Sequence, residues 1–168
     1  MIIDAARWIL FPTLMAFAAS SDLITMTISN RVQVILVAGF LALAPAVGMP
    51  LMDILWHLGA GATVLVVSFS LFVCGWIGGG DAKLAAATAL WFGFDHLLAY
   101  LIYASLIGGA LTLLLLQFRL VPLPALLAGQ PWLDRLHQKG GAVPYGIALA
   151  AAALVVYPDT LWVKVIGS

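Results

Sequence analysis

Long runs of apolar residues follow one another along this chain, and short polar segments separate them. Within the runs, apolar and polar positions do not alternate, which favours helices over the strands of a membrane barrel. A helix needs roughly 20 apolar residues to cross the hydrocarbon layer. Six runs approach or reach that length, at residues 5–20, 32–49, 53–75, 82–95, 97–118 and 142–160. The pattern predicts an all-α integral membrane protein with about six transmembrane helices.

Two of these runs have a second interpretation. The run at 82–95 is short and rich in alanine, so we expect it to be tilted or packed inside protein rather than facing lipid. The first run, with Arg7 before an apolar stretch and small residues after it, also fits a cleavable signal peptide. We prefer a retained first helix, because a polar segment with its own structural pattern follows at once.

One long polar connection, between residues 118 and 142, separates the last two runs. Its prolines, glycines and mixed charges predict an extramembrane loop, with a short surface helix at "PWLDRLHQ". The sequence has no internal repeat, no low-complexity tract and no soluble domain. We therefore expect one transmembrane domain over residues 1–168.

Composition agrees with a membrane protein and excludes several other classes. Hydrophobic residues make up 64% of the chain and charged residues 8%, whereas soluble domains carry about 25% charged residues. The apolar composition makes the lipid bilayer the expected partner. The formal net charge is zero, so no electrostatic argument points to a nucleic acid. The single cysteine, Cys74, excludes an internal disulfide and a multi-cysteine metal cluster.

The distribution of lysine and arginine predicts the orientation. The connections after the first, third and fifth runs carry five basic residues, and the opposite side carries two. The five are Arg31, Lys83, Arg119, Arg135 and Lys139, and the two are Arg7 and Lys164. Because cytoplasmic loops are rich in basic residues, both termini are predicted outside, in the periplasm.

All seven acidic residues are aspartates, and two of them stand out. Five lie at helix ends or in loops, where capping or solvation explains them: Asp4, Asp53, Asp95, Asp134 and Asp159. Asp22 and Asp81 instead fall on the predicted cytoplasmic side at similar depth, and small residues flank each of them. A carboxylate at the membrane boundary is costly, so a function is the first hypothesis.

Two converging aspartates suggest acid–base chemistry. Carboxylates a few ångströms apart share one proton, because both cannot be ionised together. The ionised group can take a proton from an attacking water while the protonated group polarises a peptide carbonyl. The alternative is structural: Asp22 caps the next helical turn, and Asp81 pairs with Lys83.

Four short motifs resemble one family. The stretch "GGGD", Gly78–Asp81, fits the Gly-x-Gly-Asp signature of intramembrane aspartyl proteases, and "SDLITMTISNR" resembles the Asp-x6-Ser/Pro-Asn segment of type IV prepilin peptidases. "GDAKL" matches the family's GDxKL continuation, and "VPYGIALA" is similar to the PYGxA start of its last helix. These segments span essentially the whole chain.

The resemblance implies an aspartic endopeptidase that needs no cofactor or metal. Such enzymes cut the short, positively charged leader from prepilins and pseudopilins at the cytoplasmic face of the bacterial inner membrane. Asp22 and Asp81 match the catalytic pair. The chain lacks the family's cytoplasmic region with paired Cys-x-x-Cys motifs, so we expect neither N-methyltransferase activity nor a zinc site. Its small size is most similar to the peptidases of Flp-type (tight adherence) pili.

The resemblance also implies supporting residues. Gly78 and Gly80 would allow a tight turn at the scissile peptide, although a helix C-cap explains the same glycines. Lys83 would reach lipid headgroups or tune the aspartate pair, and we favour the former. Asn30 would orient the Asp22 loop. Ser29 stands where many relatives carry proline, and this departure is tolerable if Asn30 caps the next helix. Tyr145 would hydrogen-bond near the site or anchor a helix at the interface.

Two other functions fit an apolar protein with aspartates. A proton- or cation-coupled transporter would place carboxylates near the bilayer midplane and show inverted repeats, and this sequence shows neither. A non-catalytic subunit of pilus assembly would use the aspartates for packing alone. The three histidines, His57, His96 and His137, form no ligand pattern with the aspartates.

Overall fold

Helices make up the fold in the computed structural model, which describes residues 2–123 and 129–164. The long helices are α1 (Ile2–Thr25), α2 (Asn30–Ala46), α3 (Leu51–Val73) and α4 (Gly79–Phe118). The shorter ones are α5 (Pro131–His137), α6 (Tyr145–Val156), the 3-10 turn η1 (Tyr157–Asp159) and α7 (Leu161–Lys164). No strand occurs within these described ranges. The predicted all-α class is confirmed.

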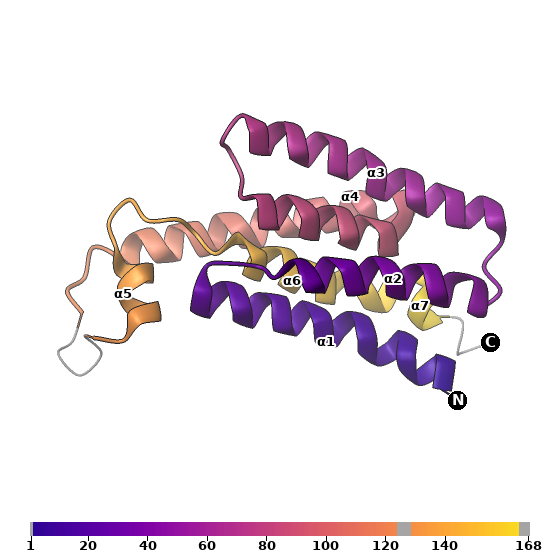
Figure 1. Cartoon of the computed structure of the whole chain (residues 1–168). Helices are drawn as coiled ribbons and strands as arrows, with labels where there is room; N and C mark the ends of the chain where they lie inside the picture. Colours follow the sequence, from indigo (N-terminus) through magenta and orange to yellow (C-terminus); the bar gives the residue numbers. More distant parts are fainter. Residues whose placement is uncertain (1, 124–128, 165–168) are drawn as a thin grey trace.

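Helix α4 consists of two helices joined at Gly93. This glycine has φ 62° and ψ −175°, a conformation that is essentially restricted to glycine. The halves 79–92 and 94–118 run in opposite directions (Figure 1). They correspond to the two apolar runs predicted at 82–95 and 97–118. A Cβ atom at Gly93 would lie 2.9 Å from Nε2 of His57, so the reversal also needs a residue without a side chain.

Helices α1, α2 and α3, the two halves of α4 and helix α6 alternate in direction along the bundle (Figure 1). Helix α4 packs against α3, α6 and α2. From Leu84 to Gly93 every residue of its first half is buried. The alanine-rich run is therefore packed inside protein, which was one of its two predicted interpretations.

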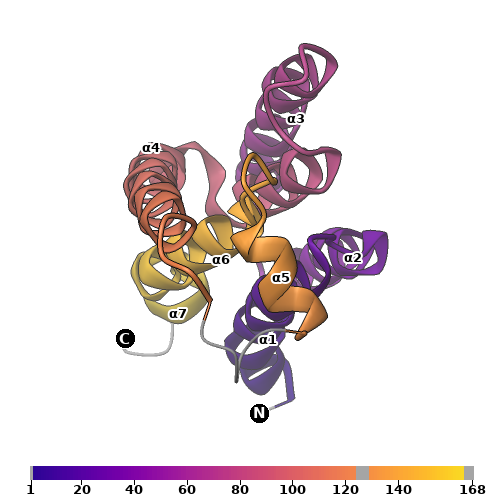
Figure 2. The ribbon, with the colours of Figure 1, turned by 90° about the vertical axis from the view of Figure 1, so that its left-hand side faces the viewer.

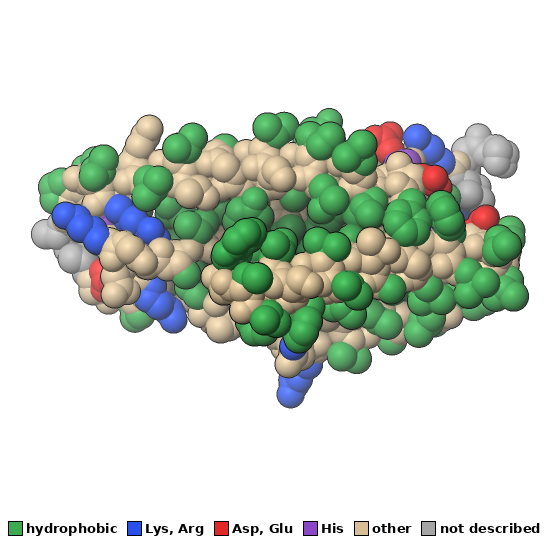
Figure 3. Space-filling model, turned by 90° about the horizontal axis from the view of Figure 1, so that it is seen from above, with side chains coloured by type: hydrophobic (Ala, Val, Ile, Leu, Met, Phe, Trp, Pro, Cys, Tyr) green, Lys and Arg blue, Asp and Glu red, His purple; other side chains and the backbone are tan. Residues whose placement is uncertain are grey.

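Three helices are long and apolar enough to cross a membrane, by length and composition: residues Ile3–Thr25, Leu51–Val73 and Gly79–Phe118. Helix α2 and the segment Tyr145–Asp159 are apolar but shorter. Hydrophobic side chains cover much of the molecular face in Figure 3, whereas many charged side chains gather toward its two ends. This surface suits a lipid environment. The count of six spans and the periplasmic termini stay predictions.

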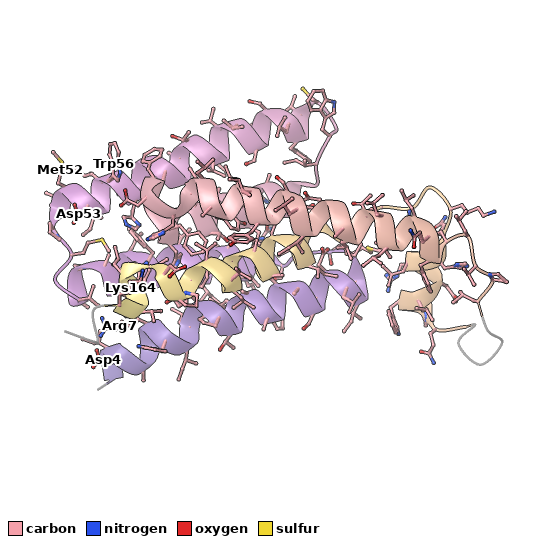
Figure 4. The ribbon with its side chains drawn as sticks, turned by 180° about the vertical axis from the view of Figure 1, so that it is seen from behind. Asp4, Arg7, Met52, Asp53, Trp56 and Lys164 are labelled. Atoms are coloured by element: carbon pink, nitrogen blue, oxygen red, sulfur yellow. The ribbon has the colours of Figure 1, made fainter. Side chains whose placement is uncertain are left out.

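One end of the bundle gathers the start of α1, the end of α7 and the start of α3 (Figure 4). Asp4, Arg7, Asp53 and Lys164 lie there, and Nη2 of Arg7 is 2.7 Å from Oδ1 of Asp4. The C-terminal end of α1 and the start of α4 lie at the opposite end (Figure 1). The short helix expected at "PWLDRLHQ" is present as α5.

Candidate active site

Asp22 lies near the C-terminal end of α1 and is 5% exposed. Its Oδ2 accepts a hydrogen bond of 2.7 Å from the backbone N–H of Gly146, and the N–H of Ile147 also faces this carboxylate. Both amides belong to the first turn of α6. The first N–H groups of a helix have no partner within the helix and favour a negative charge. The start of α6 therefore stabilises the ionised carboxylate.

Asp81 lies in the first turn of α4 and is half-buried. The N-cap of this helix is Gly78, which offers no side chain for capping. The Asp81 carboxylate instead turns back toward the backbone N–H of Gly78. A Cβ atom at Gly78 would lie 2.9 Å from Oδ2 of Asp81. Because Gly78 has no side chain, the Asp81 carboxylate can occupy this space.

The structure brings the two aspartates to the same end of the bundle, where their carboxylates interact electrostatically. Asp22 approaches from the end of α1 and Asp81 from the beginning of α4. Two carboxylates in such a position can divide one proton between them, which provides a general base and a general acid side by side.

The C-cap explanation of the triple glycine is wrong for Gly78. Helix α3 already ends at Val73, and its C-terminal turn is closed at Gly75, which has φ 76°. The N–H of Gly75 donates to the Phe72 carbonyl at 2.9 Å, and the N–H of Trp76 donates to the Leu71 carbonyl at 3.0 Å. These two bonds form a Schellman motif. The glycines from residue 78 onward belong to the start of α4.

Lys83 and Asn30 contact each other. Nζ of Lys83 donates a hydrogen bond of 3.0 Å to Oδ1 of Asn30, and both residues are exposed. Among the described residues no ion pair joins Lys83 to Asp81, so that structural alternative is not supported. Lys83 ties the start of α2 to the start of α4, a role that the sequence did not suggest.

The expectation that Asn30 caps α2 is wrong. Ser29 is the N-cap, and its Oγ accepts a hydrogen bond of 3.3 Å from the backbone N–H of Arg31. Asn30 is the first residue of the helix, so its amide oxygen remains available to Lys83. Serine is a preferred N-cap residue, so Ser29 can start α2 in place of a proline.

Tyr145 contacts the second half of α4. Its hydroxyl donates to the carbonyl of Ala104 at 3.4 Å, and its ring occupies the space beside Gly108. Both contacts are with the second half of α4. Tyr145 therefore fixes the first turn of α6, and with it the neighbouring Gly146 that binds Asp22. Sequence reasoning noted the segment "VPYGIALA" but not the role of Gly146.

The long connection docks against the aspartate end of the bundle, where α5 lies across the helix ends (Figure 2). Buried Arg119 holds it, with Nε donating to the Leu136 carbonyl and Nη2 to the Ala142 carbonyl, each at 2.8 Å. Nη2 of Arg135 donates to the carbonyl of Ile24 at 2.6 Å, two residues after Asp22. The sequence had indicated these arginines only as orientation signals.

The side chains at this site suit acid–base chemistry. No group of three or more His, Cys, Asp or Glu residues that could hold a metal ion occurs in the part of the chain that the structure describes. The polar groups that converge are two carboxylates and the amides at the starts of α4 and α6.

Comparison with protein families gives one match. A family model described as the type IV leader peptidase family matches residues 9–113. The matched region contains Asp22, Asp81 and most of the two helices that carry them, and it ends before Gly146. Neither a curated protein nor a solved structure matches the chain.

Proposed function

The chain belongs to the type IV leader peptidase family, and from this premise we propose that it is an aspartic endopeptidase with Asp22 and Asp81 as its catalytic pair. The proposed substrates are type IV prepilins of the Flp type, from which the enzyme removes the positively charged leader. The observation that carries the proposal is the electrostatic interaction between the two carboxylates at one end of the bundle, with the start of α6 binding Asp22.

The surroundings of the two carboxylates suggest how they divide the work. Asp22 faces two backbone amides at a helix N-terminus, which favour its ionised form. It would therefore take a proton from water as the water oxygen attacks the peptide carbonyl carbon. Asp81 would carry the shared proton and donate it to the carbonyl oxygen. These two transfers leave a tetrahedral diol at the former carbonyl carbon. The proton held by Asp22 then passes to the leaving nitrogen as the C–N bond breaks, and a hydroxyl group of the diol returns a proton to Asp81.

The proposed location is the cytoplasmic face of the bacterial inner membrane. The basic residues of the predicted topology support it, because they gather on the side that carries both aspartates. The Flp type is proposed because only a short segment joins α1 to α2, and it contains no Cys-x-x-Cys motif. For the same reason we expect the new N-terminus of the product to be unmethylated.

The test is the N-terminal mass of a co-expressed Flp-type prepilin, measured with the wild-type protein and with Asp22→Asn, Asp81→Asn and Asp134→Asn variants. The first two variants should leave the prepilin at full length, because neither carboxylate can do the other's proton transfer. Asp134 is exposed on α5, so its variant should cleave normally. Normal cleavage by either of the first two variants, at wild-type levels in the membrane, would contradict the proposal.

A further inference from the structure

Ile28 lies between the two elements that present the aspartates. It belongs to the short segment between α1 and α2 and is 9% exposed. On one side it contacts Gly80, which directly precedes Asp81. On the other side it contacts Gly146, whose N–H binds Asp22. Neither the acid–base chemistry nor the motif pattern assigns this side chain a task.

The contacts use different atoms of the isoleucine. A Cβ atom placed on Gly80 would lie 3.4 Å from Cβ of Ile28, and one placed on Gly146 would lie 2.6 Å from its Cδ1. Ile28 therefore fills the space that a side chain at Gly146 would need, and it lies within van der Waals reach of Gly80. Because a β-branched side chain is stiff about χ1, the two contacts are held at a defined separation.

The backbone that carries Ile28 is also fixed. The Ser21 hydroxyl donates to the Thr27 carbonyl at 2.9 Å, and the N–H of Met26 donates to the Asp22 carbonyl at 2.9 Å. Met26 adopts φ 56°, which turns the chain sharply after α1. These bonds anchor the segment to the last turn of α1. Ile28 thus projects from the helix of one aspartate toward the helix start of the other.

We propose that Ile28 is a positioning residue that sets the separation of the two aspartate carboxylates by keeping the start of α4 and the start of α6 apart at a fixed distance. The proposal rests on the proposed function of Asp22 and Asp81. Geometry at a reacting centre is demanding, since a misplacement of about 1 Å can cost about 100-fold in rate. A shorter side chain at position 28 would let the two helix starts shift.

Ile28→Val removes one of the two contacts and keeps the other. Valine keeps the Cβ atom that faces Gly80 and removes only the Cδ1 atom that faces Gly146. We expect kcat on a purified Flp-type prepilin to fall about tenfold with KM changed less than about twofold, and Ile28→Ala to cost about 100-fold. The matched control is Ile107→Val, which removes the same atom from a half-buried position in the second half of α4.

The pH–rate profile provides a readout that general loosening of the core would not change. Two carboxylates that repel each other lose their protons at well-separated pH values, and the singly protonated pair is active between them. If the shorter side chains of the Ile28 variants let the two helix starts approach, the carboxylates come closer, their repulsion strengthens and the active pH range widens. Ile107→Val should keep the wild-type width.

The outcomes separate this inference from the function on which it rests. If Asp22→Asn and Asp81→Asn abolish cleavage while Ile28→Val keeps wild-type kcat and profile width, only the positioning role is wrong. An equal loss of kcat in Ile107→Val would also overturn it, since the effect would then be general destabilisation. If the aspartate variants cleave normally, both proposals are wrong. Melting in detergent confirms that the two valine variants are equally folded.

Discussion

The backbone N–H of Gly146 donates a hydrogen bond of 2.7 Å to the Asp22 carboxylate, across 124 positions of the chain. The first turn of α6 is therefore part of the candidate site, although it carries no acidic residue. This contact depends on the absence of a side chain. A Cβ atom at Gly146 would lie 2.7 Å from Oδ2 of Asp22 and 2.6 Å from Cδ1 of Ile28.

Gly146→Ala should consequently lower the rate of prepilin cleavage by about 100-fold, because the methyl group displaces the carboxylate from its amide. Overpacking should also reduce the free energy of unfolding by about 1–3 kcal/mol. Gly109→Ala is the control, since a Cβ atom there meets nothing within 4 Å. Kinetics and thermal melting in detergent measure both effects. Equal activity of the two variants would argue against a close fit at Gly146.

Gly93→Ala should destabilise the reversal within α4. The glycine-only backbone conformation costs about 1–3 kcal/mol for another residue, and the added methyl group would press on the His57 ring. His57→Ala alone loses the hydrogen bond to the Leu90 carbonyl, so the steric part is obtained from a double-mutant cycle. In the His57→Ala background, Gly93→Ala should cost less than in the wild type and retain the backbone part. Thermal unfolding midpoints of the four proteins give the comparison. No cost of Gly93→Ala in the His57→Ala background would show that backbone strain contributes nothing.

Tyr100 and Tyr157 should respond in opposite directions when phenylalanine replaces them. The fully buried Tyr100 hydroxyl faces Thr88, but it lacks a hydrogen bond of acceptable geometry within the described residues. A buried hydroxyl without a bond costs about 1–3 kcal/mol, so Tyr100→Phe should raise the free energy of unfolding.

The Tyr157 hydroxyl donates to the backbone carbonyl of Arg7. Tyr157→Phe should therefore lower the free energy of unfolding by about 1 kcal/mol. Denaturation in detergent compares each variant with the wild type. A loss of stability in Tyr100→Phe would mean that its hydroxyl has a bonded partner in the working protein.

Arg119→Met should release α5 from the aspartate end of the bundle. The variant loses both hydrogen bonds to the Leu136 and Ala142 carbonyls, and the carbonyl of buried Leu136 loses its donor. We expect limited proteolysis to cut the connection around α5 faster, with the cut sites read by mass spectrometry. Lys139→Met, at an exposed position, should keep the wild-type rate. Unchanged proteolysis of Arg119→Met would mean that other contacts hold α5.

The helices could be predicted from sequence because long apolar runs leave few alternatives to a membrane helix. The pair Asp22 and Asp81 could be predicted because carboxylates are conspicuous in such runs. The reversal in α4 was placed between the runs ending at 95 and beginning at 97, where polar Asp95 and His96 interrupt them. It occurs at Gly93, because the turn needs a backbone conformation that polarity does not reveal.

Contacts made by backbone atoms and by single apolar side chains were beyond sequence reasoning. The N–H of Gly146 has no side-chain signature, and Ile28 resembles any other isoleucine in an apolar protein. Lys83 was expected at lipid headgroups, because nothing in the sequence indicated that Asn30 lies beside it. Such pairings follow from how the starts of three helices meet, which only the tertiary structure provides.

The enclosed first half of α4 has a consequence for how the protein is made. Segment 79–92 is surrounded by other helices and is shorter than the roughly 20 residues that span a bilayer independently. Gly93 joins it directly to the longer apolar segment 94–118. Its insertion is therefore coupled to that partner, and we expect the translocon to release the two together as a helical hairpin. Biogenesis and the placement of Asp81 thus depend on the same glycine.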